Sequence, residues 1–289
     1  MNMGKLLLIT GLLLLPALSL GQGLSESVRF HHMRINAVDP EASQAFYEQF
    51  LGAISVQYNN QVPAIFHTHG FVVFNKVDSP AATAPFSPIW HMGWAGVDGR
   101  AEYDWLSAQG VEYDTPPTDL GNNTYQYMLG PDKEMVEIYT GAKNHRYEHI
   151  HLWATDVKAT SDWFVNNLGF FGREAGERPT DGSRWSAFLE TGLMNLYIYG
   201  VPNENDRVYR PIHEEGLRPS EGSVFNHIAY SFRDIEPVYA HMTNNGVEII
   251  EEISWKEALG YRSFFAMAPD QLLIEIVEAV PVPESMWER

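Results

Sequence analysis

Four segments of the chain share one pattern, in which a histidine in an apolar run is followed seven residues later by an aspartate. The pairs are His32 and Asp39, His91 and Asp98, His149 and Asp156, and His227 and Asp234. Each aspartate precedes a stretch with helical periodicity, which ends at Gly52, Gly110, Gly169 or Gly246. An aspartate side chain caps a helix by accepting backbone N–H groups, and glycine adopts the left-handed conformation that closes one. Each segment therefore predicts a strand followed by a helix.

Short strands are predicted after each helix. In the first segment they are "AISVQY", "AIFHTH" and "FVVFNKV", and in the fourth "VEIIEEI", "RSFFAMA" and "QLLIEIVEA". These runs are rich in β-branched and aromatic residues, which favour strands. Each unit therefore reads βαβββ, and the predicted fold is α+β with four such modules.

The four units alternate in type. Units one and three have "LGA" and "LGF" after the helix, whereas units two and four have "QGVEY" and "NGVEI". Only units two and four end in a Pro-Asp-x₄-Glu strand, from Pro131 to Glu137 and from Pro269 to Glu275. The chain therefore looks like a duplicated pair, and we expect domains at residues 27–143 and 144–281. The pattern leaves open whether neighbouring units pair or whether they cross over.

The first residues of the chain resemble an export signal. Lys5 precedes an apolar run from Leu6 to Leu20, with small residues before Gln22. The run is short for a membrane span, so residues 1–21 are expected to be a cleaved signal peptide that leads to the periplasm or the medium. We expect no stable membrane association. The formal net charge of −18 also disfavours nucleic acid as a partner.

The repeated histidines and the two closing glutamates suggest metal ligands. Nothing in the packing of a buried strand calls for an imidazole, because Val or Ile fits that position better. A carboxylate inside an apolar strand is costly unless a cation compensates it. The chain has no cysteine, so any metal site must use imidazole and carboxylate groups.

The four His-x₆-Asp starts and the two Pro-Asp-x₄-Glu ends resemble the vicinal oxygen chelate superfamily, which includes glyoxalases, bleomycin-resistance proteins and extradiol dioxygenases. The resemblance implies that paired βαβββ modules form open barrels around a divalent metal. Carried over to neighbouring units, it implies the ligand sets His32, His91 and Glu137, and His149, His227 and Glu275. Two histidines and one carboxylate favour Fe(II), with Mn, Zn, Ni or Co as alternatives. The closing strands of units one and three have no acid, so a site with four protein ligands is not expected.

The resemblance also implies catalytic and substrate-binding residues. A histidine on an inner strand and a tyrosine four residues before the closing proline have catalytic roles in extradiol dioxygenases, and they correspond here to His69 and Tyr127. Strand alternation places Arg34 on the face of His32, and His151 and Trp153 on the face of His149. We expect these side chains either to contact the substrate or to support a metal ligand, and an interior ion pair is a further alternative for Arg34.

Three functions fit this pattern. The first is a non-haem Fe(II) dioxygenase acting on a small substrate with two neighbouring oxygens. The second keeps the metal but catalyses an isomerase, epimerase or glyoxalase-like lyase reaction. The third is a non-catalytic small-molecule binding protein of the resistance type. His69 and Tyr127 favour the dioxygenase, and two intact ligand sets count against the binding protein. The sequence does not predict the oligomeric state.

Overall fold

The structure is a computed structural model that describes residues 28–68, 70–80, 86–192, 194–202 and 209–279. The expected signal peptide, residues 1–21, lies outside the described residues. No helix in the described ranges is both long enough and apolar enough to span a membrane.

All four βαβββ units are present, which confirms the expected α+β fold. Unit one contains β1 (Arg29–Ala37), α2 (Pro40–Leu51), β2 (Ile54–Tyr58), β3 (Val62–His67) and β4 (Gly70–Lys76). Unit two contains β5 (Ile89–Ala95), α3 (Gly99–Ala108), β6 (Tyr113–Leu120), β7 (Asn123–Leu129) and β8 (Met135–Tyr139). Unit three contains β9 (Arg146–Ala154), α4 (Val157–Leu168), β10 (Phe171–Arg173), β11 (Ser186–Glu190) and β12 (Asn195–Gly200).

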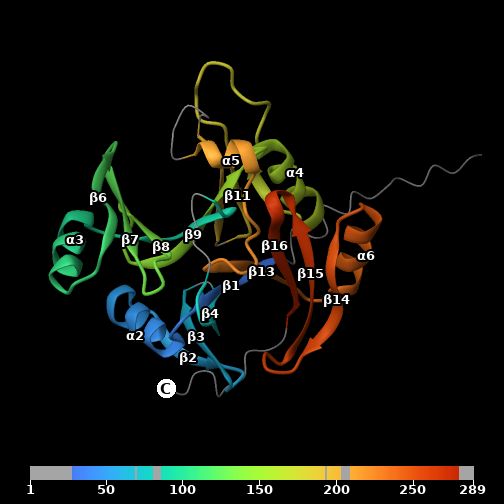
Figure 1. Cartoon of the computed structure of the whole chain (residues 1–289), viewed down its shortest axis with the longest axis horizontal. Coiled ribbons are helices and arrows are strands. Elements are labelled where there is room, and N and C mark those ends of the chain that lie inside the picture. Colours follow the sequence, from blue (N-terminus) through green and yellow to red (C-terminus); the bar gives the residue numbers. More distant parts are fainter. Residues whose placement is uncertain (1–27, 69, 81–85, 193, 203–208, 280–289) are drawn as a thin grey trace, which may run out of the picture.

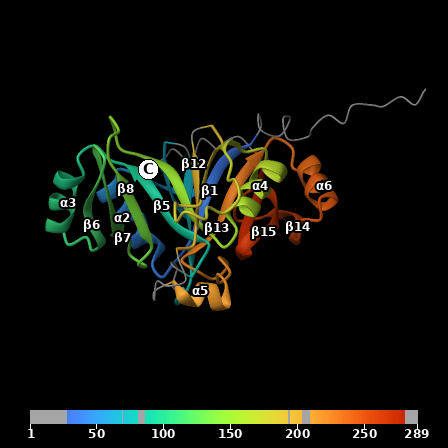
Figure 2. The same ribbon diagram turned by 90° about the horizontal axis from the view of Figure 1, so that it is seen from above.

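Unit four contains β13 (Phe225–Phe232), α6 (Glu236–Asn244), β14 (Ile249–Lys256), β15 (Tyr261–Ala268) and β16 (Leu272–Glu278), with the 3₁₀ turn Pro269–Gln271 before β16. A short helix, α5 (Arg210–Glu215), lies in the connection between units three and four. In Figure 2, α3 and α6 lie at opposite ends of the molecule and α5 stands out from the sheets.

The strands form two eight-stranded sheets that combine the units crosswise. One sheet has the order β14-β15-β16-β13-β1-β4-β3-β2, and the other has the order β10-β11-β12-β9-β5-β8-β7-β6. In each sheet the first strands of two units pair antiparallel, β1 with β13 and β5 with β9. Figure 1 shows this as blue β1 beside orange β13. Unit one therefore shares a sheet with unit four, and unit two with unit three.

The two sheets cross the expected domain ranges. Residues 27–143 and 144–281 are each a pair of neighbouring units in sequence, but neither range forms a sheet of its own. Neighbouring units are instead joined near their Pro-Asp turns. Asp132 accepts a hydrogen bond from the Val38 backbone N–H at 3.0 Å, and Asp270 accepts one from that of Thr155 at 2.9 Å. The first strands of these joined units pair with other units instead, β1 with β13 of unit four and β5 with β9 of unit three.

The helix caps follow the sequence pattern in three units of the four. Asp39, Asp98 and Asp156 are N-cap residues whose side chains accept backbone N–H groups of the first turn. In unit four the N-cap is Ile235, and Asp234 accepts the Glu236 backbone N–H instead. In the other units the aspartate accepts the N–H of the residue three places later. In unit four that residue is Pro237, which has no N–H, so Asp234 accepts the N–H of Glu236.

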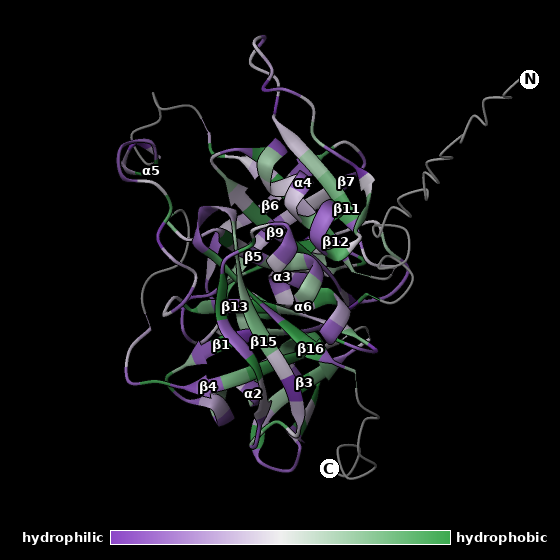
Figure 3. Ribbon diagram, turned by 90° about the vertical axis from the view of Figure 1, so that its right-hand side faces the viewer, coloured by the Kyte–Doolittle hydropathy of each residue, from purple (hydrophilic) through white to green (hydrophobic). Residues whose placement is uncertain are grey.

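The core lies on one face of the central strands. In β1, Met33, Ile35 and Ala37 are buried in the main hydrophobic cluster, together with Trp94 of β5 and other residues of all four units. Successive strand residues point to opposite faces, so His32, Arg34 and Asn36 point away from that cluster. Figure 3 shows hydrophobic residues along the central strands and hydrophilic residues on the outer helices. The packing of one face thus leaves the histidines on the other.

Candidate metal centre

The six expected ligands come together in two groups, each on the histidine face of one sheet. The first, the Glu137 centre, consists of His91, Glu137, His149 and His151. The second, the Glu275 centre, consists of His32, His227 and Glu275. In each group one ligand atom per residue lies within 4.8 Å of all the others.

The expected ligand sets are therefore corrected by the crossed sheets. His32 was expected with His91 and Glu137, but it lies with His227 and Glu275. His149 was expected with His227 and Glu275, but it joins His91 and Glu137. The cause is the pairing of β5 with β9 and of β1 with β13.

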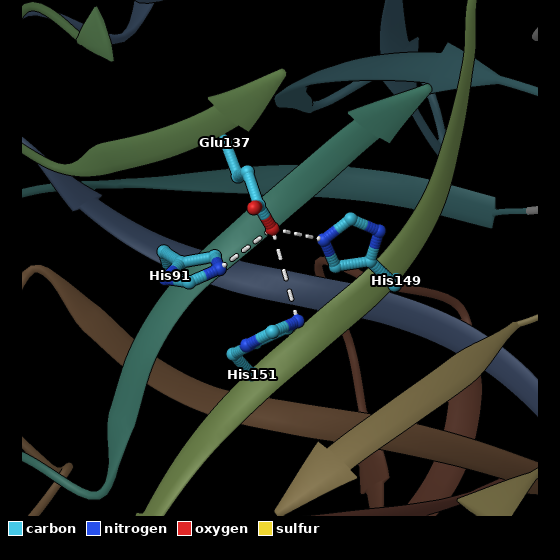
Figure 4. A group of neighbouring side chains, drawn as sticks. All are labelled: His91, Glu137, His149 and His151. Carbon is cyan, nitrogen blue, oxygen red and sulfur yellow. Dashed lines mark hydrogen bonds and ion pairs between the residues drawn. The ribbon is translucent and has the colours of Figure 1, made fainter. Parts of the chain in front are cut away.

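Three imidazoles surround one carboxylate oxygen in the Glu137 centre (Figure 4). Oε2 of Glu137 lies 3.1 Å from Nε2 of His91, 2.8 Å from Nε2 of His149 and 3.7 Å from Nε2 of His151. The histidines come from the adjacent strands β5 and β9, and Glu137 comes from β8, which pairs parallel with β5. All four side chains are buried.

Gly93 makes room for the ring of His149. The two residues are register partners across β5 and β9, and a Cβ atom on Gly93 would lie 1.9 Å from Nε2 of His149. Only a residue without a side chain leaves this space. The glycine two residues after His91 therefore has a defined role in the ligand arrangement.

The charges of the Glu137 centre are strongly coupled. Burial raises the pKa of Glu137, but its hydrogen bonds with His149 and His91 outweigh burial and hold the pKa well below the ordinary value. Burial lowers the pKa of His149, but hydrogen bonds with Glu137 and Glu148 raise it to about 9. Burial lowers the pKa values of His91 and His151. Without a metal the centre therefore holds a carboxylate, an imidazolium and two neutral imidazoles.

These residues fit a divalent transition metal. Three imidazole nitrogens directed at one buried carboxylate oxygen form a donor set that such ions prefer. A cation would replace the proton on His149, since metal-bound imidazole must be deprotonated at the ligating nitrogen. Three of the donors were expected as ligands, and the fourth, His151, was expected as a substrate contact.

A cavity of about 450 Å³ opens beside the Glu137 centre. Glu137, His149 and His151 line it together with Tyr127, and the walls include further aromatic side chains: Trp90, Tyr125, Tyr139, Tyr197 and Tyr199. Arg184 also reaches into it. A small aromatic or planar molecule therefore has direct access to the candidate ligands.

The Glu275 centre is enclosed by packed side chains. Oε2 of Glu275 lies 3.1 Å from Nε2 of His227 and 3.3 Å from Nε2 of His32. Tyr58 and Tyr261 pack beside it in a separate hydrophobic cluster with Phe71 and Val277. The Tyr261 hydroxyl donates a hydrogen bond of 3.5 Å to Oε2 of Glu275, and all three candidate ligands of this centre are buried.

Arg34 further distinguishes the Glu275 centre. It lies two residues after His32 and opposite His227, just as His151 lies two residues after His149 and opposite His91. A guanidinium therefore occupies the position of the fourth donor. Burial lowers the pKa of Arg34, while the charges of Tyr261 and Glu275 oppose this effect. Arg34 thus supplies a positive charge near Glu275 without a metal.

The expected catalytic and substrate residues have different positions. Tyr127 of β7 lies opposite Glu137, and its ring centroid is 5.0 Å from that of His91. Trp153 stacks on Trp90 with centroids 4.2 Å apart, and the Trp90 ring lies 4.4 Å from that of His91. His69 lies outside the described residues. Arg34, expected beside an open substrate site, belongs to the enclosed centre.

The sequence reasoning missed several residues of the cavity. Tyr197 and Tyr199 of β12 lie opposite His151 and Trp153 in the register with β9, so they line the same face. The alternation in "NLYIYG" was the signal for them. Arg184 lies in an irregular segment before β11, where no periodicity indicates its direction.

Comparison with known proteins connects this geometry to a family. The family model described as the Glyoxalase/Bleomycin resistance protein/Dioxygenase superfamily matches residues 29–138 and 146–276. Curated protein sequences gave no match.

Solved structures with a similar fold include glyoxalase I from Zea mays, with 15% identity, a TM-score of 0.68 and coverage of 87% of this chain and 92% of that one. A putative dioxygenase from Bacillus subtilis subsp. subtilis str. 168 has 14% identity, a TM-score of 0.63 and coverage of 91% of each chain. At these identities the likeness concerns the fold.

Proposed function

The chain belongs to the Glyoxalase/Bleomycin resistance protein/Dioxygenase superfamily, and from this premise we propose that it is a metal-dependent enzyme whose Glu137 centre acts on a small aromatic substrate with two neighbouring oxygens. The reaction we propose is an extradiol-type dioxygenation with Fe(II). One observation carries the proposal: the buried ligand set of the Glu137 centre opens into a cavity with aromatic walls, whereas the Glu275 centre is enclosed.

His91, Glu137 and His149 would hold the ion, a composition of two histidines and one carboxylate that suits non-haem Fe(II). When bound there, such an ion would supply coordination chemistry toward a substrate and dioxygen. The aromatic walls exclude water from the reacting atoms and orient a planar ring by stacking.

His151 and Tyr127 would handle the protons. Burial holds the pKa of His151 well below its ordinary value, so its imidazole is neutral and can accept a proton from a substrate hydroxyl at Nε2. Burial raises the pKa of Tyr127, so its phenol stays protonated and can donate a hydrogen bond to a substrate oxygen. His69, the histidine expected to act as the acid–base group, lies outside the described residues, and His151 takes its role in this proposal.

A metal-dependent isomerase or lyase is the second candidate, because His151 offers a fourth donor atom. If His151 also held the ion, fewer coordination positions would remain open, and the ion would supply Lewis-acid chemistry to the substrate. Mn, Zn, Ni or Co would serve this reaction as well as iron.

Oxygen uptake with catechol separates these candidates. We expect iron-loaded protein to consume oxygen, Glu137→Gln to abolish the uptake and Glu275→Gln to leave it nearly unchanged. Turnover of an enolisable substrate under argon with Zn²⁺ would instead establish the isomerase or lyase. Catechol binding without turnover under either condition would identify a non-catalytic binding protein.

We also propose that residues 1–21 are a cleaved signal peptide and that the enzyme works outside the cytoplasm. The apolar run after Lys5 supports this. Mass spectrometry of protein from the periplasm or the medium tests it, since cleavage leaves an N-terminus at Gln22 and retention leaves the full chain.

A further inference from the structure

A second cavity adjoins the cavity of the Glu137 centre. Its volume is about 560 Å³, and it shares Trp90, Arg184 and Tyr199 with the first cavity. These three side chains therefore stand at the boundary between the two spaces. A ligand longer than a single ring could extend from the ligand atoms past Arg184 into the second cavity.

The second cavity is positively charged, which is unusual in this chain. The whole sequence has a formal net charge of −18. Arg178 and Arg184 both line the second cavity, and its described lining residues include no aspartate or glutamate. The ion pairs of the described residues include neither arginine, so both guanidinium groups retain their hydrogen-bond donors for a ligand.

Aromatic rings hold the two arginines in place. The guanidinium carbon of Arg184 lies 4.7 Å from the centroid of the Tyr199 ring, and that of Arg178 lies 5.8 Å from the centroid of the Trp185 ring. Stacking on a ring fixes a guanidinium while leaving its edge free to bind a carboxylate. Trp90 and Trp153, stacked with ring centroids 4.2 Å apart, form another wall of this space.

We propose that the substrate carries a carboxylate beyond its metal-binding ring, and that Arg184, assisted by Arg178, binds this carboxylate in the second cavity. The proposal rests on the proposed function of the Glu137 centre and adds a class of substrate to it, namely aromatic acids with two neighbouring ring oxygens. Arg184 is the specificity-determining residue, since it contacts both cavities.

The test compares two probes on Zn²⁺-loaded protein, in which binding is measured without turnover. The probes are 4-methylcatechol and 3,4-dihydroxyphenylpropanoate, which share the metal-binding ring and differ in the carboxylate. Isothermal titration of the wild type is expected to give about fivefold tighter binding of the acid, the size for a partly exposed charge pair. Arg184→Gln should remove this preference, so that this variant binds the two probes with equal affinity.

Two further variants sharpen the result. Arg184→Lys should keep part of the preference, because the charge remains while the paired donors are lost. Arg233→Gln is the matched control, because Arg233 is exposed and lies outside the lining of both cavities. This control should keep the full preference.

Equal binding of the two probes to the wild type, or a preference that persists in Arg184→Gln, would overturn the carboxylate proposal while leaving the Glu137 centre intact. Failure of both probes to bind, or binding that is unchanged in Glu137→Gln, would refute the proposed function and this inference with it.

Discussion

Replacing Gly93 by alanine tests the Glu137 centre without altering any ligand. The added Cβ would lie 1.9 Å from Nε2, 2.1 Å from Cε1 and 2.3 Å from Cδ2 of His149. Ordinary van der Waals contact begins near 3.4 Å, so the imidazole would have to move by about 1.5 Å. His149 is buried and lies between Glu137 and Glu148, so it has little room to move.

The expected loss of metal affinity follows from the narrow range of bond lengths that metal coordination allows. Bond lengths in metal sites stay within about 0.2 Å of their ideal values, so a displacement of this size removes His149 as a ligand. Altering partners outside the ligand shell already costs about 10–100-fold in metal affinity, so losing a ligand should cost at least about 100-fold. The strain of the extra methyl group should lower the free energy of unfolding by about 1–3 kcal/mol.

Cobalt titration followed by visible absorption measures the effect. The titration uses a Glu275→Gln background, so that only cobalt bound at the Glu137 centre contributes to the signal. Ala229→Gly is the matched control, because Ala229 lies opposite His32 just as Gly93 lies opposite His149. We expect the control to keep the cobalt affinity of its parent. If Gly93→Ala bound cobalt as tightly as its parent, His149 could not be a ligand in the position found here.

Three other predictions follow from the charges and the caps. Metal affinity should rise about tenfold per pH unit up to about pH 9, because the ion must displace the His149 proton. Calorimetric titration of the metal between pH 6.5 and 9 measures this rise, and an affinity that does not change with pH would contradict it. In metal-free protein, the stabilisation from His149 is fully present below pH 6.5 and is lost as pH rises through about 9. The reason is that the pKa of His149 is higher in the folded state than its ordinary value of 6.5. Melting temperatures measured with a chelator should therefore fall over this pH range, and a rise would contradict the prediction. Asp98→Ala should lower the free energy of unfolding by about 1 kcal/mol because it removes the N-cap of α3, and equal urea midpoints for this variant and the exposed control Asp104→Ala would contradict the capping role.

The sequence was sufficient for the fold because each unit carries its own local signals. The aspartate caps, the terminal glycines and the alternation of the strands concern neighbouring residues, so they can be read without knowledge of the tertiary structure. The Pro-Asp-x₄-Glu strands likewise identified Glu137 and Glu275 as buried acids, and both lie among histidines.

The pairing of the units could not be predicted in the same way. The first strands of all four units have similar patterns, so each could pair with any other. The choice depends on contacts between residues that are distant in sequence. One is the 2.6 Å hydrogen bond that the Tyr47 hydroxyl donates to Glu134, which links unit one to unit two outside the sheets.

The difference between the two centres was also hidden from the sequence. His149 and His32 occupy equivalent strand positions, but the residue two places later is His151 in one case and Arg34 in the other. This difference between His151 and Arg34 can be read from the sequence. The sequence does not show, however, that Tyr58 and Tyr261 pack beside the Glu275 centre. Side-chain packing across the sheet decides which centre has a cavity.

An anomalous difference map from a cobalt-loaded crystal tests the central claim most directly. The account predicts a peak within bonding distance of His91, Glu137 and His149, in a sheet that joins β5 to β9. A peak bonded to His32 together with His91, or no peak beside Glu137, would contradict it.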